Sequence, residues 1–230
     1  MTEDPQPPFT LGRRTWVDSD PPTAQRLAWH RLSAAMRKLN EALMDMDAPE
    51  ADLLAAATIA EQFATTLEAT RTGRQHWGFA ESSTSGSTHA MLDRSPIIGL
   101  GNPVAPPLKF RELDGEVEGT GTFGLQYEGP PGCVHGGFVA AAFDEVLGMA
   151  QSMTGRPGMT GTLTIRYRKP TPLHVELLFR ARVDRVEGRK IFAAGELYAG
   201  DVLCAEAEGI FVSVDFDRMR ALREAAQQAP

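Results

Sequence analysis

Cysteine is scarce in this 230-residue sequence, where only Cys133 and Cys204 occur, far apart along the chain. Two such distant thiols make neither a disulfide framework nor a zinc-binding pair, and they suit a reducing compartment. Long apolar runs are also missing, because the longest ones reach about eight residues where roughly 18 to 20 are needed to cross a bilayer. The first ten residues lack the basic and apolar regions of a signal peptide. The sequence therefore predicts a cytoplasmic protein with no membrane span.

An excess of positive charge is absent too, since 23 Lys and Arg stand against 30 Asp and Glu, for a formal net charge of -7. A nucleic-acid partner needs a basic face for its phosphates and is not expected. The five histidines show no metal-ligand spacing, so no metal and no cofactor are predicted. Neither a G-x-S-x-G elbow nor a Walker motif occurs, which excludes α/β-hydrolases and P-loop proteins.

What is present is enough apolar sequence for a core, at 42% of the chain. Residues 1–22 are rich in proline and are predicted to form an extended or disordered arm. Residues 23–71 hold two stretches with apolar residues at three- and four-residue steps, broken near Pro49, which predicts a helical hairpin with Thr23 as N-cap. A Ser- and Pro-rich linker that lies on the surface is predicted over residues 72–107.

From residue 108 the apolar period changes to two, which indicates strands with one buried face. Strands are predicted over 159–168, 173–186, 190–199 and 203–214, and short turns between them favour antiparallel pairing. Residues 136–153 are apolar nearly all round and are expected to form a buried helix. This order predicts an α+β hotdog fold, an antiparallel sheet wrapped around one long helix, over residues 108–215. Residues 216–230 are assigned to a short C-terminal helix and tail.

The helix begins at the Gly-rich string GPPGCVHGG, residues 129–137. Backbone N–H groups at a helix N-terminus are unpaired and lie at the positive end of the dipole, so Gly136 and Gly137 can present them to an oxyanion. Asp144 follows half a turn round and roughly 13 Å along from His135. One helix cannot aim both at a single carbonyl, whereas two antiparallel helices of a twofold dimer can.

The strings EGPPGCVHGGFVAAAFDE, MTGTLTIRYRKPTPL and DRVEGRK resemble PaaI-type hotdog acyl-CoA thioesterases, in particular the mitochondrial long-chain enzymes. The resemblance implies an acyl-CoA substrate and a homodimer or dimer of dimers. It also implies a role for each site residue. Asp144 would be the nucleophile or general base, Thr160 would position water or Asp144, and the Gly136 N–H, beside Gly137, would polarise the thioester carbonyl. His135 would orient the loop or bond the thioester oxygen, and Arg168 and Lys169 would lie at the ligand-binding end of a strand. Several relatives carry Asn or Gln where this chain has Gly129.

Three questions stay open at this level. Glu145 is a second carboxylate beside Asp144, and spacing does not choose between them. Residues 166–190 carry eight basic and three acidic residues, which suits either the phosphates of coenzyme A or a solvated outer face. The third question is the function. Hydrolysis of medium- to long-chain acyl-CoA is the main prediction, and the alternatives are a hydroxyacyl-CoA hydratase or dehydratase and a non-catalytic modulator that binds acyl-CoA. The G-x-G-x-x-G match at 119–124 is rejected as a dinucleotide site, because residues 125–127 are expected to continue a strand.

Overall fold

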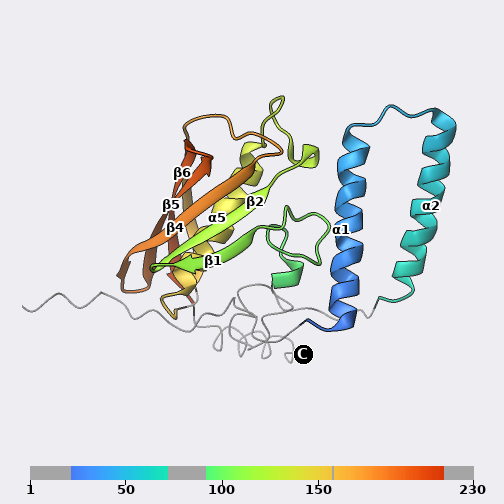
Figure 1. Ribbon diagram of the computed structural model, residues 1–230. Coiled ribbons are helices and arrows are strands. Elements are labelled where there is room, and N and C mark those ends of the chain that lie inside the picture. The colour runs from blue at the N-terminus through green and yellow to red at the C-terminus, as the bar shows by residue number, and fades with distance from the viewer. Residues whose placement is uncertain (1–21, 72–91, 157, 215–230) are drawn as a thin grey trace, which may run out of the picture.

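The computed structural model describes residues 22–71, 92–156 and 158–214 (Figure 1). Its elements in chain order are the helices α1 (Ala24–Met44) and α2 (Glu50–Glu68), the strands β1 (Lys109–Leu113) and β2 (Glu116–Thr122), the 3-10 turn η1 (Leu125–Tyr127), the helix α5 (Gly136–Ser152), and the strands β3 (Gly158–Tyr167), β4 (Glu176–Glu187), β5 (Lys190–Ala199) and β6 (Val202–Ser213). No helix among these described residues is both long and apolar enough to span a membrane. Most of the predicted arm and the whole predicted tail, residues 216–230, lie outside the described residues.

The six strands form one antiparallel sheet in the order β1-β2-β4-β5-β6-β3, and α5 packs across one of its faces (Figure 1). The strand after α5 crosses to the far edge and pairs only with β6. This arrangement confirms the predicted hotdog fold. The fourth strand begins at Glu176 rather than at residue 173, because His174 has a left-handed φ of 58° that breaks the extended chain.

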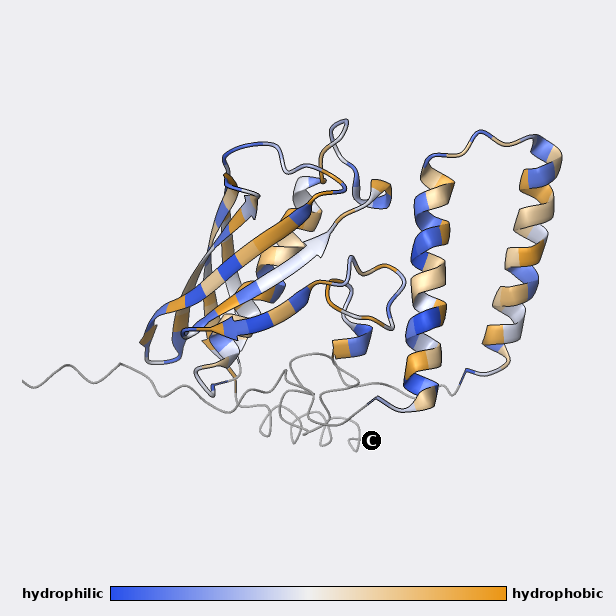
Figure 2. Ribbon diagram, in the orientation of Figure 1, coloured by the Kyte–Doolittle hydropathy of each residue, from blue (hydrophilic) through white to orange (hydrophobic). Residues whose placement is uncertain are grey.

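The core lies between α5 and the inner face of the sheet. Phe143 of α5 and Phe179 of β4 are both fully buried, and their rings meet edge-on at 5.4 Å. Along β4, buried apolar residues alternate with exposed charged ones over much of the strand, and along β5 buried residues alternate with half-buried ones. Figure 2 shows the alternation on β4 as stripes of hydrophobic and hydrophilic colour. Each large apolar side chain buried here contributes about 1.5–3 kcal/mol.

One stripe of α5 is not covered, which corrects the prediction of a helix buried on all sides. Gly137 and Asp144 are exposed, and Ala140 and Ala141 between them are only half-buried. Because positions three, four and seven residues apart share a helix face, these four residues form one continuous stripe. Its small side chains leave room for another backbone to approach closely.

Two other expectations need correction. Residues 125–127 do not continue β2 but form η1, in which Leu125 N–H donates to Glu41 Oε2 of α1 at 2.9 Å. The dinucleotide site remains rejected, since Gly119 lies within β2, where an added Cβ would meet the Phe110 ring at 2.6 Å. The described part of the predicted linker, residues 92–107, does not lie on the surface, because Ile97, Ile98 and Ala105 are buried in or beside the core.

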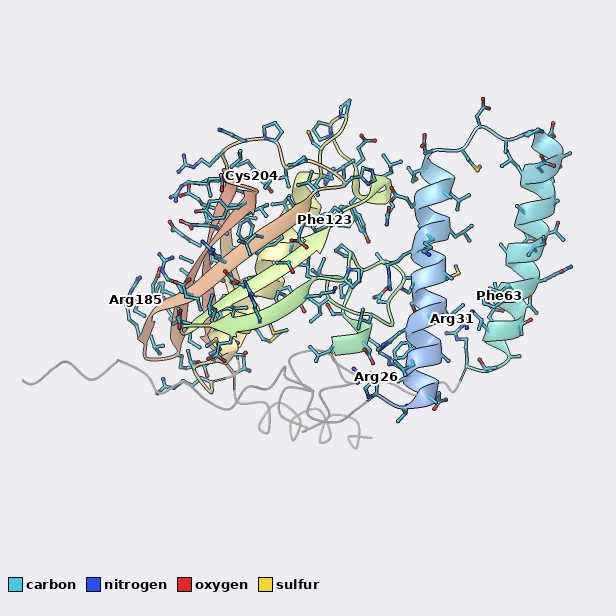
Figure 3. The ribbon with its side chains drawn as sticks, viewed as in Figure 1. Arg26, Arg31, Phe63, Phe123, Arg185 and Cys204 are labelled. Atoms are coloured by element: carbon cyan, nitrogen blue, oxygen red, sulfur yellow. The ribbon has the colours of Figure 1, made fainter. Side chains whose placement is uncertain are left out.

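The first helix of the hairpin is anchored to this buried segment. Thr23 caps α1 as predicted, accepting a hydrogen bond from Arg26 N–H. The Arg26 side chain (Figure 3) pairs with Asp93 at 2.6 Å, and Ser33 Oγ donates to Gly101 O at 2.8 Å. The contacts of α1 therefore run along residues 93–103 and η1 rather than over the outer face of the sheet. By contrast, α2 has no buried residue.

Candidate active site

The loop before α5 is held by backbone hydrogen bonds on both sides. Gly129 N–H donates to Cys133 O at 2.9 Å, and His135 N–H donates to Tyr127 O at 2.8 Å. Gly129 packs so closely on His135 that an added Cβ would lie 2.7 Å from its Cα. With the backbone in this position, only glycine fits there.

The N-terminus of α5 presents one open N–H group where the sequence predicted two. His135 is the N-cap, and its Nδ1 accepts the Gly137 N–H at 3.0 Å. The Gly136 carbonyl accepts the Tyr167 hydroxyl of β3 at 2.8 Å, which fixes the peptide between the two glycines. No described residue accepts the Gly136 N–H. That group therefore keeps its hydrogen-bonding capacity at the positive end of the helix.

Asp144 and Thr160 are brought together by the packing of α5 on the edge strand. The Thr160 hydroxyl donates to Asp144 Oδ1 at 2.7 Å, and both residues are exposed. This bond uses one carboxylate oxygen and leaves the other open. Sequence spacing alone did not predict the pairing, because it depends on the register between a helix and a strand sixteen residues later.

The neighbouring carboxylate has a different environment. Glu145 points inward, where its Oε1 accepts the Ser95 hydroxyl at 3.2 Å. Ser95 Oγ in turn accepts the N–H groups of Ile97 and Ile98 at 3.1 and 3.2 Å. Burial, with a smaller contribution from the charge of Asp144, raises the pKa of Glu145 to about 7. Of the two carboxylates, Asp144 is thus the accessible one and Glu145 a support for the 92–98 segment.

This raised pKa predicts a pH-dependent stability. Folded Glu145 holds its proton up to about pH 7, while the unfolded carboxyl releases it near 4.5, so the native state is progressively destabilised as pH rises between these values. Glu145→Gln keeps an acceptor for Ser95 and carries no charge. We expect the variant to match the wild type below pH 4.5 and to exceed its unfolding free energy at pH 8 by up to about 3 kcal/mol. Urea unfolding across this range measures the difference, and parallel stability curves would contradict it.

The predicted basic patch is largely neutralised by carboxylates from neighbouring strands. Arg168 pairs with Glu206 at 2.5 Å, and Arg180 pairs with Glu118 at 3.1 Å. The net charge counted along 166–190 missed these partners, which lie elsewhere in the sequence. In the described part of the chain, Lys169 forms no ion pair. Of Arg168 and Lys169, the two residues predicted to bind the ligand, Lys169 is therefore the one that remains available to bind a phosphate.

The two functional ends of α5 are far apart within one chain. Tyr167 meets Gly136 at one end of β3, and Thr160 meets Asp144 towards the other. Eight residues of helix separate Gly136 from Asp144 by about 12 Å, too far for both to contact one carbonyl group. Among the described residues, no cluster of three or more His, Cys, Asp or Glu is placed to hold a metal ion.

Known proteins are similar to the part of the chain that contains α5 and the sheet. A sequence model of the thioesterase superfamily matches residues 131–206. Acyl-coenzyme A thioesterase THEM4 of Bos taurus is 36% identical over 94 residues, which cover 40% of this chain and 38% of the relative. THEM4 of Xenopus laevis is 33% identical over 93 residues, covering 40% and 42%. The chain spans less than half the length of these curated relatives.

A solved structure extends the match further. A thioesterase superfamily protein of known crystal structure is 34% identical in sequence to this chain and superposes on it with a TM-score of 0.73. The match covers 84% of this chain and 97% of that protein's chain. Residues 92–214 make up only about half of the 230 residues. A coverage of 84% therefore reaches well into the residues before the sheet domain.

Proposed function

The chain belongs to the thioesterase superfamily, and on this premise we propose that it hydrolyses medium- to long-chain acyl-CoA to free fatty acid and coenzyme A. The curated relatives named acyl-coenzyme A thioesterase support this activity over the part of their length that the chain spans. The active unit we propose is a homodimer, in which Gly136 of one subunit and Asp144 of the other act on the same thioester.

The observation that carries this proposal is the open face of α5. It presents an unpaired Gly136 N–H at its start and an exposed, Thr160-bonded carboxylate about 12 Å further on. If two copies of α5 pack in antiparallel fashion along this face, each N–H lies opposite the partner's carboxylate, and twofold symmetry makes two sites. The alanines between Gly137 and Asp144 permit that close approach.

The chemistry follows from these groups. In the general-base route, Asp144 takes a proton from water as the water oxygen bonds to the carbonyl carbon, and the Gly136 N–H stabilises the oxyanion. The carbon–sulfur bond then breaks, and the proton held by Asp144 passes to the leaving thiolate. In the nucleophilic route, Asp144 attacks the carbonyl carbon, the carbon–sulfur bond breaks, and coenzyme A leaves as a thiolate. Water then hydrolyses the acyl–aspartate anhydride, which gives the free acid and the Asp144 carboxylate, and the proton released by water passes to the thiolate. In both routes the Thr160 bond orients the carboxylate.

Hydration chemistry is less well supported by this geometry. It needs a histidine and a carboxylate that act together as acid and base. Here His135 is committed through Nδ1 to the Gly137 N–H, and no described carboxylate forms a hydrogen bond with its ring. The thioesterase is therefore the function we propose.

Thiol release from a series of acyl-CoA esters tests the proposal. We expect turnover with medium and long saturated chains. A folded protein that binds acyl-CoA but releases no thiol would favour the non-catalytic modulator. Loss of enoyl-CoA absorbance without thiol release would favour a hydratase.

The Thr160 hydroxyl gives a second test of the site. Thr160→Val removes the hydrogen bond to Asp144 and keeps the branched side chain that suits a strand. A hydrogen bond to a charged group contributes about 1.5–3 kcal/mol, so we expect kcat to fall about 10- to 100-fold with KM little changed. Thr160→Ser keeps the hydroxyl and should restore most of the rate. Equal rates for Val and Ser would show that the bond has no role in turnover.

A further inference from the structure

The two helices of the N-terminal hairpin are separated by an apolar groove. Its volume is about 560 Å³, and Figure 3 shows the labelled Phe63 on the side of α2 that faces α1. It is lined by residues of both helices and of the anchoring segment, mainly Leu32, Met36, Ile59, Phe63 and Leu67. No described residue fills this apolar groove, and contact with water is unfavourable for an apolar surface of this size.

Among the described residues, the second helix has no partner that buries any of its side chains. All of its residues are exposed, including Leu54 at 62% and Ile59 at 67%. A helix of 19 residues is marginally stable in water by propensity alone, so α2 depends on tertiary or quaternary contacts. The exposed apolar residues extend along the full length of both helices, about 28 Å, and also onto the outer side of α2 at Leu54. A single acyl chain in the groove would leave most of that surface uncovered.

The charges of the two helices are complementary. Among the charged residues of α1, four are basic and only Glu41 is acidic, whereas α2 carries four carboxylates and no Lys or Arg. Arg31 and Lys38 are seven residues apart on one face of α1. Glu61 and Glu68 have the same spacing on one face of α2, so both pairs are about 10 Å apart. None of these four residues forms an ion pair with another described residue.

We propose that the hairpin binds the hairpin of a second copy of this chain, with α1 of each copy packed against α2 of the other. A twofold pairing of identical hairpins matches each basic face to an acidic one and covers both grooves at once. Two helices about 28 Å long and 10 Å wide present roughly 560 Å² in projection. Because side chains make the real surface larger than its projection, the area that each hairpin would bury is in the range of specific interfaces.

This surface is separate from the open face of α5. We place the two contacts between different pairs of chains, so that, if the proposed function is right about the α5 interface, four 25.0 kDa chains assemble. Only that total rests on the proposed function, because the hairpin contact is defined by its own residues.

Sedimentation velocity on the full chain tests the contact. Ile59→Asp combined with Phe63→Asp places two charges in the groove and is expected to halve the mass of the assembly. Thr58→Asp combined with Thr65→Asp places the same charges in the same helix, where both hydroxyls bond to carbonyls of α2 itself. This control is expected to keep the wild-type mass. An unchanged mass in the groove variant would overturn the proposal and assign the groove to another occupant, such as an undescribed segment of the same chain or a lipid.

A charge exchange separates contact between chains from contact within one chain. One variant carries Arg31→Glu and Lys38→Glu, and the other carries Glu61→Lys and Glu68→Lys. Each alone presents two helices of more similar charge and is expected to show at least a tenfold weaker association. The equimolar mixture restores opposite charges only between different chains, so it should regain wild-type association. Failure of well-folded variants to recover on mixing would overturn the proposal. Thiol release by each variant shows separately whether the α5 site is intact.

Discussion

Asp144→Asn is expected to lower kcat for acyl-CoA hydrolysis by about 100- to 10,000-fold, the usual contribution of a positioned acid or base. Amide and carboxylate have nearly the same shape, and the asparagine carbonyl can still accept the Thr160 hydroxyl at the 2.7 Å position of Oδ1. What is lost is the negative charge that takes a proton from water or attacks the thioester. Steady-state thiol release, with circular dichroism and sedimentation to confirm fold and assembly, measures the effect.

The control for this experiment is Glu145→Gln, the same chemical change one residue along the helix. Glu145 faces Ser95 and the buried segment 92–98, so its amide variant is expected to keep wild-type turnover within a few-fold. If Asp144→Asn keeps full activity and Glu145→Gln loses it, the roles of the two carboxylates are reversed. If both keep full activity, the proposed hydrolysis does not use this carboxylate pair.

The fold was predictable because its signals are local and periodic. A two-residue apolar period marks the strands, a three- to four-residue period marks the hairpin, and Thr23 marks the start of α1 as its N-cap. The string from Gly129 to Asp144 likewise identifies the entry to α5 and its carboxylate. These features depend on neighbours within a few residues, which a sequence displays directly.

The details that the sequence did not predict depend on distant partners or on the orientation of a single side chain. Glu145 differs from Asp144 because Ser95, fifty residues away, packs against it. Arg168 and Arg180 of the 166–190 segment are paired with Glu206 and Glu118, on strands that only the sheet order brings next to them. The open N–H is Gly136 alone because the His135 ring turns back onto Gly137. A side-chain orientation of this kind leaves no periodic signal in the sequence.

The proposed division of each site between two subunits predicts that two inactive variants restore activity when mixed. One is Asp144→Asn, and the other is Gly136→Pro, which removes the unpaired N–H. Proline fits this position because the first residue of a helix tolerates it and His135 already has the extended ψ of 133° that a residue before proline requires. Loss of one oxyanion donor is expected to lower kcat about 100- to 1,000-fold.

In the mixed dimer, one site receives Gly136 and Asp144 intact and the other receives neither, so each heterodimer should regain about half of wild-type activity. Random mixing of equal amounts makes about half of the dimers mixed, and the sample should therefore recover about a quarter of the wild-type rate. Gly136→Ala is the matched control, since it adds a Cβ 3.2 Å from the Tyr167 hydroxyl but keeps the N–H. It should remain active alone. If chains shown by mass spectrometry to have exchanged regain no activity, each site lies within a single subunit, and the antiparallel pairing of α5 across a dimer is wrong.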